Sequence, residues 1–168
     1  MLLRHASANI KGFSHDEDHQ KPLDDHGKSD SKNLSIWLKK KKIEIDLVVS
    51  SNATRALETA DLVFSDLNVK VEKNAELYLC GYEEIYSIIK SLNNDVNNLV
   101  IVGHEPSISV SMKLLVGKMR PDLKKILDIP YPTCAMAFIY FNKISWKDLE
   151  ERDGILEALL TPKTIGLK

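Results

Sequence analysis

Short runs of apolar residues alternate along this chain with longer segments in which apolar residues recur at helical spacing. The runs Leu47–Val49 and Leu99–Val102 are unbroken, as in strands that are buried on both faces. Each run is followed by a segment of helical periodicity, so the order is strand, helix, strand, helix. Such alternation predicts an α/β fold, a three-layer sandwich in which helices flank a largely parallel central sheet.

The remaining elements follow from the same two periodicities. The polar stretch Ser7–Asp25 is expected to be a loop, and Asp24 or Asp25 is expected to cap a helix that runs to about Lys42. Other helices are expected over about 56–67, 85–92 and 106–116, and other strands over 1–3, 69–71 and 134–141, with 144–149 as a hairpin partner of the last. The tail from Gly154 is left unassigned. No repeat or linker divides the sequence, so residues 1–168 are expected to form one domain.

Composition argues against several classes of function. The formal net charge is −1, so the protein as a whole has no positive potential that would attract nucleic acid. An anion site therefore requires a local cluster of basic side chains. No apolar run approaches the roughly 20 residues of a membrane span, and no signal peptide is evident. Cys80 and Cys134 lack both metal-site spacing and the density of a disulfide scaffold, which favours a reducing compartment. We expect a cytoplasmic protein with no nucleic-acid or membrane partner.

Three polar clusters directly follow expected strands. They are Arg4-His5, Ser50–Arg55 and Gly103-His104. Because ligands of open α/β sheets bind beyond the carboxyl ends of the strands, these clusters are expected to converge at one edge of the sheet. One guanidinium group can donate two hydrogen bonds to two oxygens of the same phosphate. A neutral imidazole can attack phosphorus or help to transfer a proton. The pattern therefore predicts a site for a phosphoryl group.

The same clusters resemble the motifs of a known family, the histidine phosphatase superfamily, which is also called phosphoglycerate mutase-like. The resemblance rests on Leu3-Arg4-His5-Ala6, on Ser50–Ala56 followed by Glu58-Thr59-Ala60, and on Val102–Pro106. The small phosphohistidine phosphatases, which have no cap domain, are the most similar branch, because Lys21-Pro22-Leu23, Trp37-Leu38 and Cys80-Gly81 also match it. The resemblance covers about residues 1–119 well and the last third loosely.

This resemblance implies a phosphatase that needs neither a metal nor a cofactor. His5 would be the nucleophile that becomes phosphorylated, and Arg4, Arg55 and His104 would bind the transferred phosphoryl group. Lys21 stands where the branch often has arginine, a departure that leaves the implied mechanism unchanged. The resemblance also implies a phosphoglycerate mutase-like fold without a cap.

The general acid is left open between two carboxylates. Glu76 follows the third expected strand, as the acid does in mutase-type members, whereas Asp18 lies in the first loop, as in the small branch. Asp18 is equally compatible with a solvated loop carboxylate. A leaving imidazole is easier to protonate than an alkoxide, so a phosphohistidine substrate reduces the need for a strong acid.

The segment His15–His19 permits a different interpretation, because its two histidines and three carboxylates could bind zinc or manganese. It lies in a loop with no rigid element to impose the geometry of a metal site. A solvated polar loop near the substrate is therefore the favoured interpretation, with no metal.

The leading hypothesis is a phosphohydrolase that acts on phosphohistidine in a protein partner or on a small phosphate ester. The alternatives are a general small-molecule phosphomonoesterase and a catalytically silent module that binds phosphoryl groups. Mutase activity on sugar phosphates is disfavoured, because a chain of 168 residues leaves little room for the insertions that cap such sites.

Overall fold

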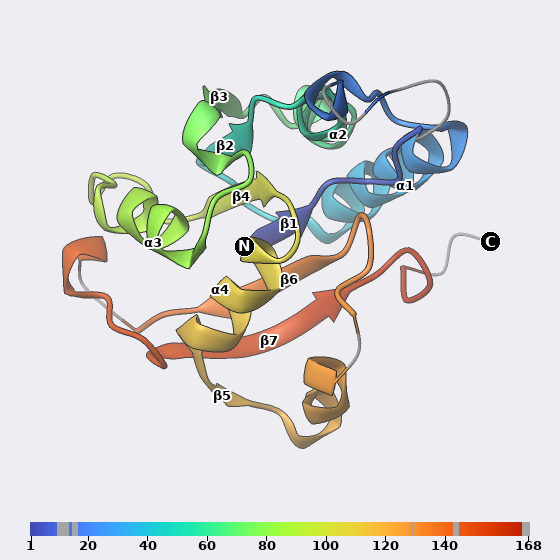
Figure 1. Cartoon of the computed structure of the whole chain (residues 1–168). Coiled ribbons are helices and arrows are strands. Elements are labelled where there is room, and N and C mark those ends of the chain that lie inside the picture. The colour runs from blue at the N-terminus through green and yellow to red at the C-terminus, as the bar shows by residue number, and fades with distance from the viewer. Residues whose placement is uncertain (10–13, 15–16, 129, 143–144, 166–168) are drawn as a thin grey trace.

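Helices cover both faces of a central seven-stranded sheet (Figure 1). The computed structural model describes residues 1–9, 14, 17–128, 130–142 and 145–165. On one face lie α1 (Asp25–Lys41) and α2 (Thr54–Phe64), and on the other lie α3 (Tyr82–Lys90) and α4 (Ser107–Leu115). The expected three-layer α/β sandwich is confirmed.

The sheet has the strand order β3-β2-β4-β1-β6-β7-β5. The strands are β1 (Leu2–Arg4), β2 (Leu47–Ser51), β3 (Lys70–Asn74), β4 (Leu99–Gly103), β5 (Val116–Met119), β6 (Met136–Tyr140) and β7 (Gly154–Leu160). All neighbours pair in parallel except β6, which is antiparallel to both β1 and β7. The carboxyl ends of β1, β2 and β4 therefore lie at the same edge of the sheet, where the sequence predicts the site.

Two apolar clusters fill the space between the sheet and its two helical layers. Successive residues of a strand point to opposite faces, so Leu3 and Val48 pack with α1 and α2, whereas Leu2 and Val49 pack with α3 and α4. The strands β2 and β4 are buried along their whole length. Their unbroken apolar runs reflect this burial on both faces.

The first helix begins where the sequence predicts. Asp24 is its N-cap, and the Asp24 carboxylate accepts a hydrogen bond from the Gly27 amide at 2.7 Å. The helix ends at Lys41, and Lys42 follows in a left-handed conformation (φ 52°). Lysines occupy its last turn, as the helix dipole favours.

The last third of the chain departs from the expected elements. The antiparallel partner of β6 is β7, not the segment 144–149. Residues Trp146–Asp148 form a 3-10 turn, in which the Trp146 indole N–H donates to the Val96 carbonyl. Leu149, the next residue, is buried, so this segment packs against the core and does not pair with β6. Ile144 lies outside the described residues. The helix expected to reach Val116 ends at Leu115, and Val116–Met119 forms β5.

Two kinds of element are absent from the described residues, a cap over the site and a membrane-spanning helix. No segment of the described chain forms a separate cap over the edge where β1, β2 and β4 end. Within the same residues, no helix is both long enough and apolar enough to cross a membrane.

Candidate active site

His5 follows β1 directly, and the sheet fixes its backbone on both sides. Its amide donates to the Gly103 carbonyl of β4 at 3.0 Å, and its carbonyl accepts from the Cys134 amide at 3.1 Å. The imidazole Nδ1–H donates to the Ala6 carbonyl at 2.8 Å, which assigns the proton to Nδ1 and leaves a lone pair on Nε2. Arg55 Nε–H points at that lone pair from 3.3 Å.

The His5 ring is neutral near pH 7. Burial, together with the nearby cations Arg55 and Arg4, lowers the pKa of His5 to about 4 against the opposing effects of the Ala6 carbonyl and Asp18. A neutral imidazole with an unprotonated Nε2 is the form that can act as a nucleophile.

The second histidine, His104, lies beyond the end of β4, next to the first. It is only 4% exposed, and its ring centroid is 5.0 Å from that of His5. Its Nε2 forms a hydrogen bond with the Ser51 hydroxyl at 2.8 Å, whereas Nδ1 has no partner among the described residues. Burial lowers the pKa of His104 to about 3, and His5 and Arg55 contribute in the same direction. Two neutral imidazoles thus lie side by side.

Arg55 stands in the first turn of α2 and is 7% exposed. Its Nη1 donates to the Asp18 carbonyl at 2.6 Å and its Nη2 to the Asp18 carboxylate at 2.9 Å. Thr59 connects this helix to the loop after β1, because its hydroxyl donates to the Arg55 carbonyl at 2.7 Å and accepts from the Ala6 amide at 3.0 Å. The Thr59 hydroxyl therefore fixes the positions of Arg55 and His5 relative to each other.

Arg4 is the last residue of β1, and its guanidinium is half-buried. Its Nη1 donates to the Tyr131 carbonyl at 2.5 Å, and its Nε is buried without a partner among the described residues. Burial lowers the pKa of Arg4 while the charge of Glu105 raises it. The side chain remains a cation, since arginine does not deprotonate in proteins.

Asp18 is brought to the site, but as an ionised carboxylate. Burial favours its neutral form, yet hydrogen bonds from Lys21, Tyr78 and Arg55 outweigh that effect and hold the pKa of Asp18 well below its usual value. Lys21 Nζ lies 3.0 Å from one carboxylate oxygen, and the Tyr78 hydroxyl donates to the other at 2.9 Å. A carboxylate paired in this way is not a proton donor in the resting site.

Tyr78 is the residue of the site that the sequence analysis missed. Beyond its bond to Asp18, its ring meets His104 edge-on at a centroid distance of 5.5 Å and His19 at 4.7 Å. The Arg55 guanidinium carbon lies 5.9 Å from the ring centroid. Tyr78 follows a 3-10 turn (Ala75–Leu77) and stands in no motif, so no sequence signal marked it.

Glu76 is not brought to the histidines by any contact of the described structure. It is exposed in the same 3-10 turn, where its amide donates to the Asn74 side chain at 2.8 Å. The two candidate acids therefore differ, since Asp18 touches Arg55 and Glu76 lies on the surface.

The suggested metal ligands are only partly described. His15 and Asp16 lie outside the described residues, and His19 Nε2 forms a hydrogen bond with the Asn52 side chain at 2.8 Å. Among the described residues, no three His, Cys, Asp or Glu side chains are grouped as metal ligands would be.

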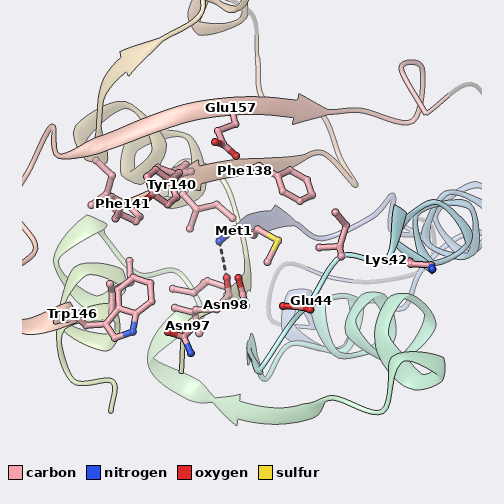
Figure 2. Close-up of a pocket in the computed structure, with 17 residues that line it drawn as sticks. Met1, Lys42, Glu44, Asn97, Asn98, Phe138, Tyr140, Phe141, Trp146 and Glu157 are labelled. Atoms are coloured by element: carbon pink, nitrogen blue, oxygen red, sulfur yellow. Dashed lines mark hydrogen bonds between the residues drawn. The ribbon is translucent and has the colours of Figure 1, made fainter. Parts of the chain in front are cut away.

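A cavity of about 400 Å³ lies at the opposite end of the sheet (Figure 2). It is lined by residues near the start of β4 and the end of β6, among them Asn98, Phe138, Tyr140 and Trp146. Because it lies at the amino end of β4, it is separate from the cluster formed by Arg4, His5, Arg55 and His104 at the carboxyl end.

Known proteins are similar to this chain in both sequence and fold. Residues 1–85 match the histidine phosphatase superfamily (branch 1). The phosphohistidine phosphatase SixA of Escherichia coli is 31% identical over 111 residues, which cover 64% of this chain and 67% of SixA. An uncharacterized protein of Mycobacterium leprae is 29% identical over 164 residues, 96% of this chain and all of that one. The structure of the protein histidine phosphatase SixA complexed with tungstate has a TM-score of 0.78 at 23% identity, and the match covers 98% and 97% of the two chains.

The match over half the chain and the similarity to SixA define the class of protein. This chain belongs to the histidine phosphatase superfamily. It is a phosphatase with the α/β sandwich of that family.

Proposed function

We propose that this protein hydrolyses phosphohistidine in a protein partner, with His5 as the nucleophile and Arg4, Arg55 and His104 as the groups that bind the phosphoryl group. The observation that carries the proposal is the state of His5. Its Nδ1–H is held by the Ala6 carbonyl, its Nε2 lone pair faces Arg55, and its pKa lies near 4. The name of the similar SixA protein, a phosphohistidine phosphatase, supports the same substrate class.

In the first step, the lone pair on His5 Nε2 attacks phosphorus. A P–N bond to His5 forms while the P–N bond to the substrate imidazole breaks, and the leaving nitrogen is protonated from solvent or by a weak acid. The guanidinium groups of Arg4 and Arg55 stabilise the charge that spreads over the phosphoryl oxygens. The ring contact between His104 and His5 supports a role for His104 in binding the same group.

In the second step, water attacks phosphorus and the bond to His5 breaks. The products are inorganic phosphate and His5, whose Nε2 is again unprotonated once the released proton passes to solvent. The same cations serve both steps, because the phosphoryl group stays in place while the nucleophile changes.

The choice of phosphohistidine over alkyl esters rests on the two candidate acids. Asp18 is an ionised carboxylate bound to Arg55, and Glu76 is exposed with no described contact to the site. An alkoxide leaving group benefits from a positioned acid by about a hundredfold or more, whereas an imidazole leaves readily once protonated. Neither candidate acid is a ready proton donor, which suits an imidazole leaving group.

A comparison of three substrates tests this choice. At one pH, kcat/KM is expected to be about a hundredfold or more higher for phosphohistidine than for an alkyl phosphate, the range that a missing general acid accounts for, with an aryl phosphate between them. Asp18→Asn and Glu76→Gln should have small effects on phosphohistidine. If the alkyl phosphate is the best substrate and Glu76→Gln removes that activity, the protein is a general phosphomonoesterase instead. If wild-type protein binds phosphate but turns over none of the three, it is a silent phospho-binding module.

Metal independence is part of the proposal, because Arg4 and Arg55 supply the positive charge that a cation provides in metal-dependent phosphatases. Activity is expected to be unchanged in excess EDTA. Loss of turnover on chelation, with recovery on adding zinc or manganese, would favour a metal site that includes His15 and His19.

A further inference from the structure

Leu79 combines two features that disfavour a leucine at its position. Its backbone is left-handed, with φ 53°, a conformation that a side chain with a Cβ adopts only at a cost and that glycine or asparagine adopts more readily. Its side chain is 74% exposed and so gains little from burial. Neither the backbone conformation nor burial in the core favours a leucine at this position. Residues with strained backbone conformations of this kind are found most often at functional sites.

Two of the four other left-handed non-glycine residues in the described part of the chain have ordinary explanations. Lys42 follows the C-terminal end of α1, and Asn68 follows the 3-10 turn Ser65–Leu67; both are positions where helical segments commonly end in this conformation. Leu79 instead stands between a site residue and α3, in the segment coloured green in Figure 1 that joins β3 to α3.

The position of Leu79 is next to the candidate active site. It directly follows Tyr78, whose hydroxyl binds Asp18 and whose ring touches His104. Adjacent Cα atoms are about 3.8 Å apart, so Leu79 lies at the rim of the site. Tyr78 makes the contacts inward, and the side chain of Leu79 is left to solvent.

Exposed carboxylates flank this side chain along the chain. Glu76 precedes Leu79, and Glu83 and Glu84 follow it in the first turn of α3. The Glu84 carboxylate also accepts from the Gly81 amide at 2.8 Å. An exposed apolar side chain with acidic residues three to five positions away in the sequence, next to Tyr78 of the candidate site, is complementary to a surface that places apolar and basic side chains around a phosphorylated residue.

We propose that Leu79 is a docking residue for the substrate protein. It contacts an apolar side chain next to the phosphohistidine, while Glu76 and Glu83 attract lysine or arginine of the same partner segment. This inference rests on the proposed function, since it names the surroundings of the phosphohistidine that the site accepts. Its occupant is a protein segment whose phosphohistidine is flanked by leucine-like and basic residues.

Two phosphohistidine peptides of equal length, made with phosphoramidate, test the proposal. Both carry arginine next to the phosphohistidine, and they differ only in that one carries leucine where the other carries serine. Wild-type protein is expected to have a kcat/KM at least about tenfold higher for the leucine peptide, mainly through a lower KM. Leu79→Gly, which suits the left-handed backbone, should lose most of this preference but keep wild-type turnover of free phosphohistidine.

Leu79→Asn is the second variant, because asparagine also tolerates the left-handed conformation and keeps a side chain. Ile36→Ala is the matched control, since Ile36 is 54% exposed on α1 and outside the site, and it should keep the preference for the leucine peptide. Equal loss of activity on all substrates in both Leu79 variants would mean that Leu79 shapes the site and does not dock a partner.

The same measurements distinguish an error in the docking role of Leu79 from an error in the proposed function. If wild-type protein hydrolyses phosphohistidine but shows no preference between the peptides, or if both Leu79 variants keep it, docking through Leu79 is wrong and the proposed function stands. If wild-type protein hydrolyses neither peptide nor free phosphohistidine, the proposed function itself is wrong, and the docking role with it.

Discussion

The burial that keeps His5 and His104 neutral also makes the fold sensitive to acid. The pKa of His5 is about 4 and that of His104 about 3 in the folded protein, against 6.5 for an unperturbed histidine. Between those values the unfolded chain binds protons that the folded chain does not. Stability is therefore expected to be full above pH 6.5 and to fall as the pH drops toward the folded pKa values.

Protonation of His5 and of His104 in the unfolded chain is expected to lower the free energy of unfolding by on the order of 2 kcal/mol each between pH 7 and pH 5. Urea denaturation at the two pH values measures this loss, and His5→Gln should reduce it by about one histidine's share. His26→Gln is the control: His26 is exposed and its pKa is raised by its own backbone hydrogen bond and by Asp30, so its removal should leave the loss unchanged or slightly larger. A His5→Gln protein with the wild-type loss would show that His5 is not buried in its neutral form.

The sequence predicts several of the side chains that the structure brings together at the candidate site. Arg4, His5, Arg55 and His104 could be found because each follows a strand that the apolar pattern identifies. Tyr78 could not, because its contacts with Asp18 and His104 depend on how the segment after β3 folds back over the site. The state of Asp18 was equally hidden, since its ionisation depends on Lys21, Tyr78 and Arg55 together.

The loop after β1 packs against the N-terminal end of α1. The Ser7 hydroxyl donates to the Asp24 carboxylate at 2.6 Å, and the Asp24 amide donates to the Ser7 carbonyl at 3.1 Å. Gly27, in the first turn of α1, is so close to this loop that an added Cβ would overlap the Ser7 backbone oxygen. The loop that leaves His5 is thus held against the start of the helix.

Gly27→Ala is expected to push α1 and the Ser7 loop apart, since neither backbone can yield without moving the other. Destabilisation of about 1–3 kcal/mol is expected, as for overpacked sites, with a loss of turnover because Ser7 is two residues from His5. Gly81→Ala is the control, because its added Cβ would meet only the flexible carboxylates of Glu83 and Glu84. Wild-type stability and turnover in Gly27→Ala would show that this contact does not position the site.

Elements with strong periodicity were predictable, and those defined by pairing were not. The runs Val48–Val49 and Val100–Val102 predict β2 and β4, and Asp24 predicts the start of α1. By contrast, β7 includes Glu157 and Ala158 in a run that fits a helix as well as a strand. Its identity comes from pairing with β6 and β5 on its two sides, which the local sequence does not encode.

Across the whole molecule, parallel strands bring together residues that are far apart in the sequence. β1 pairs with β4, and β4 pairs with β2, so their carboxyl ends deliver His5, His104 and the start of α2 to one edge. The sequence could predict this convergence from the alternation of strands and helices. It could not predict that β6 enters beside β1 in the antiparallel direction, because that choice depends on the tertiary pairing of the last third.

Whether a phosphoryl group forms a bond to His5 during turnover tests the proposed mechanism most directly. Wild-type protein is mixed with phosphoramidate, quenched in base at low temperature, and examined by intact mass and fragment mapping. We expect a transient increase of one phosphoryl group that maps to His5, is lost in acid, and is absent from His5→Gln, while His104→Gln forms it more slowly. A His5→Gln protein that still gains the phosphoryl group, or that hydrolyses phosphohistidine at the wild-type rate, would contradict the assignment of His5 as the nucleophile.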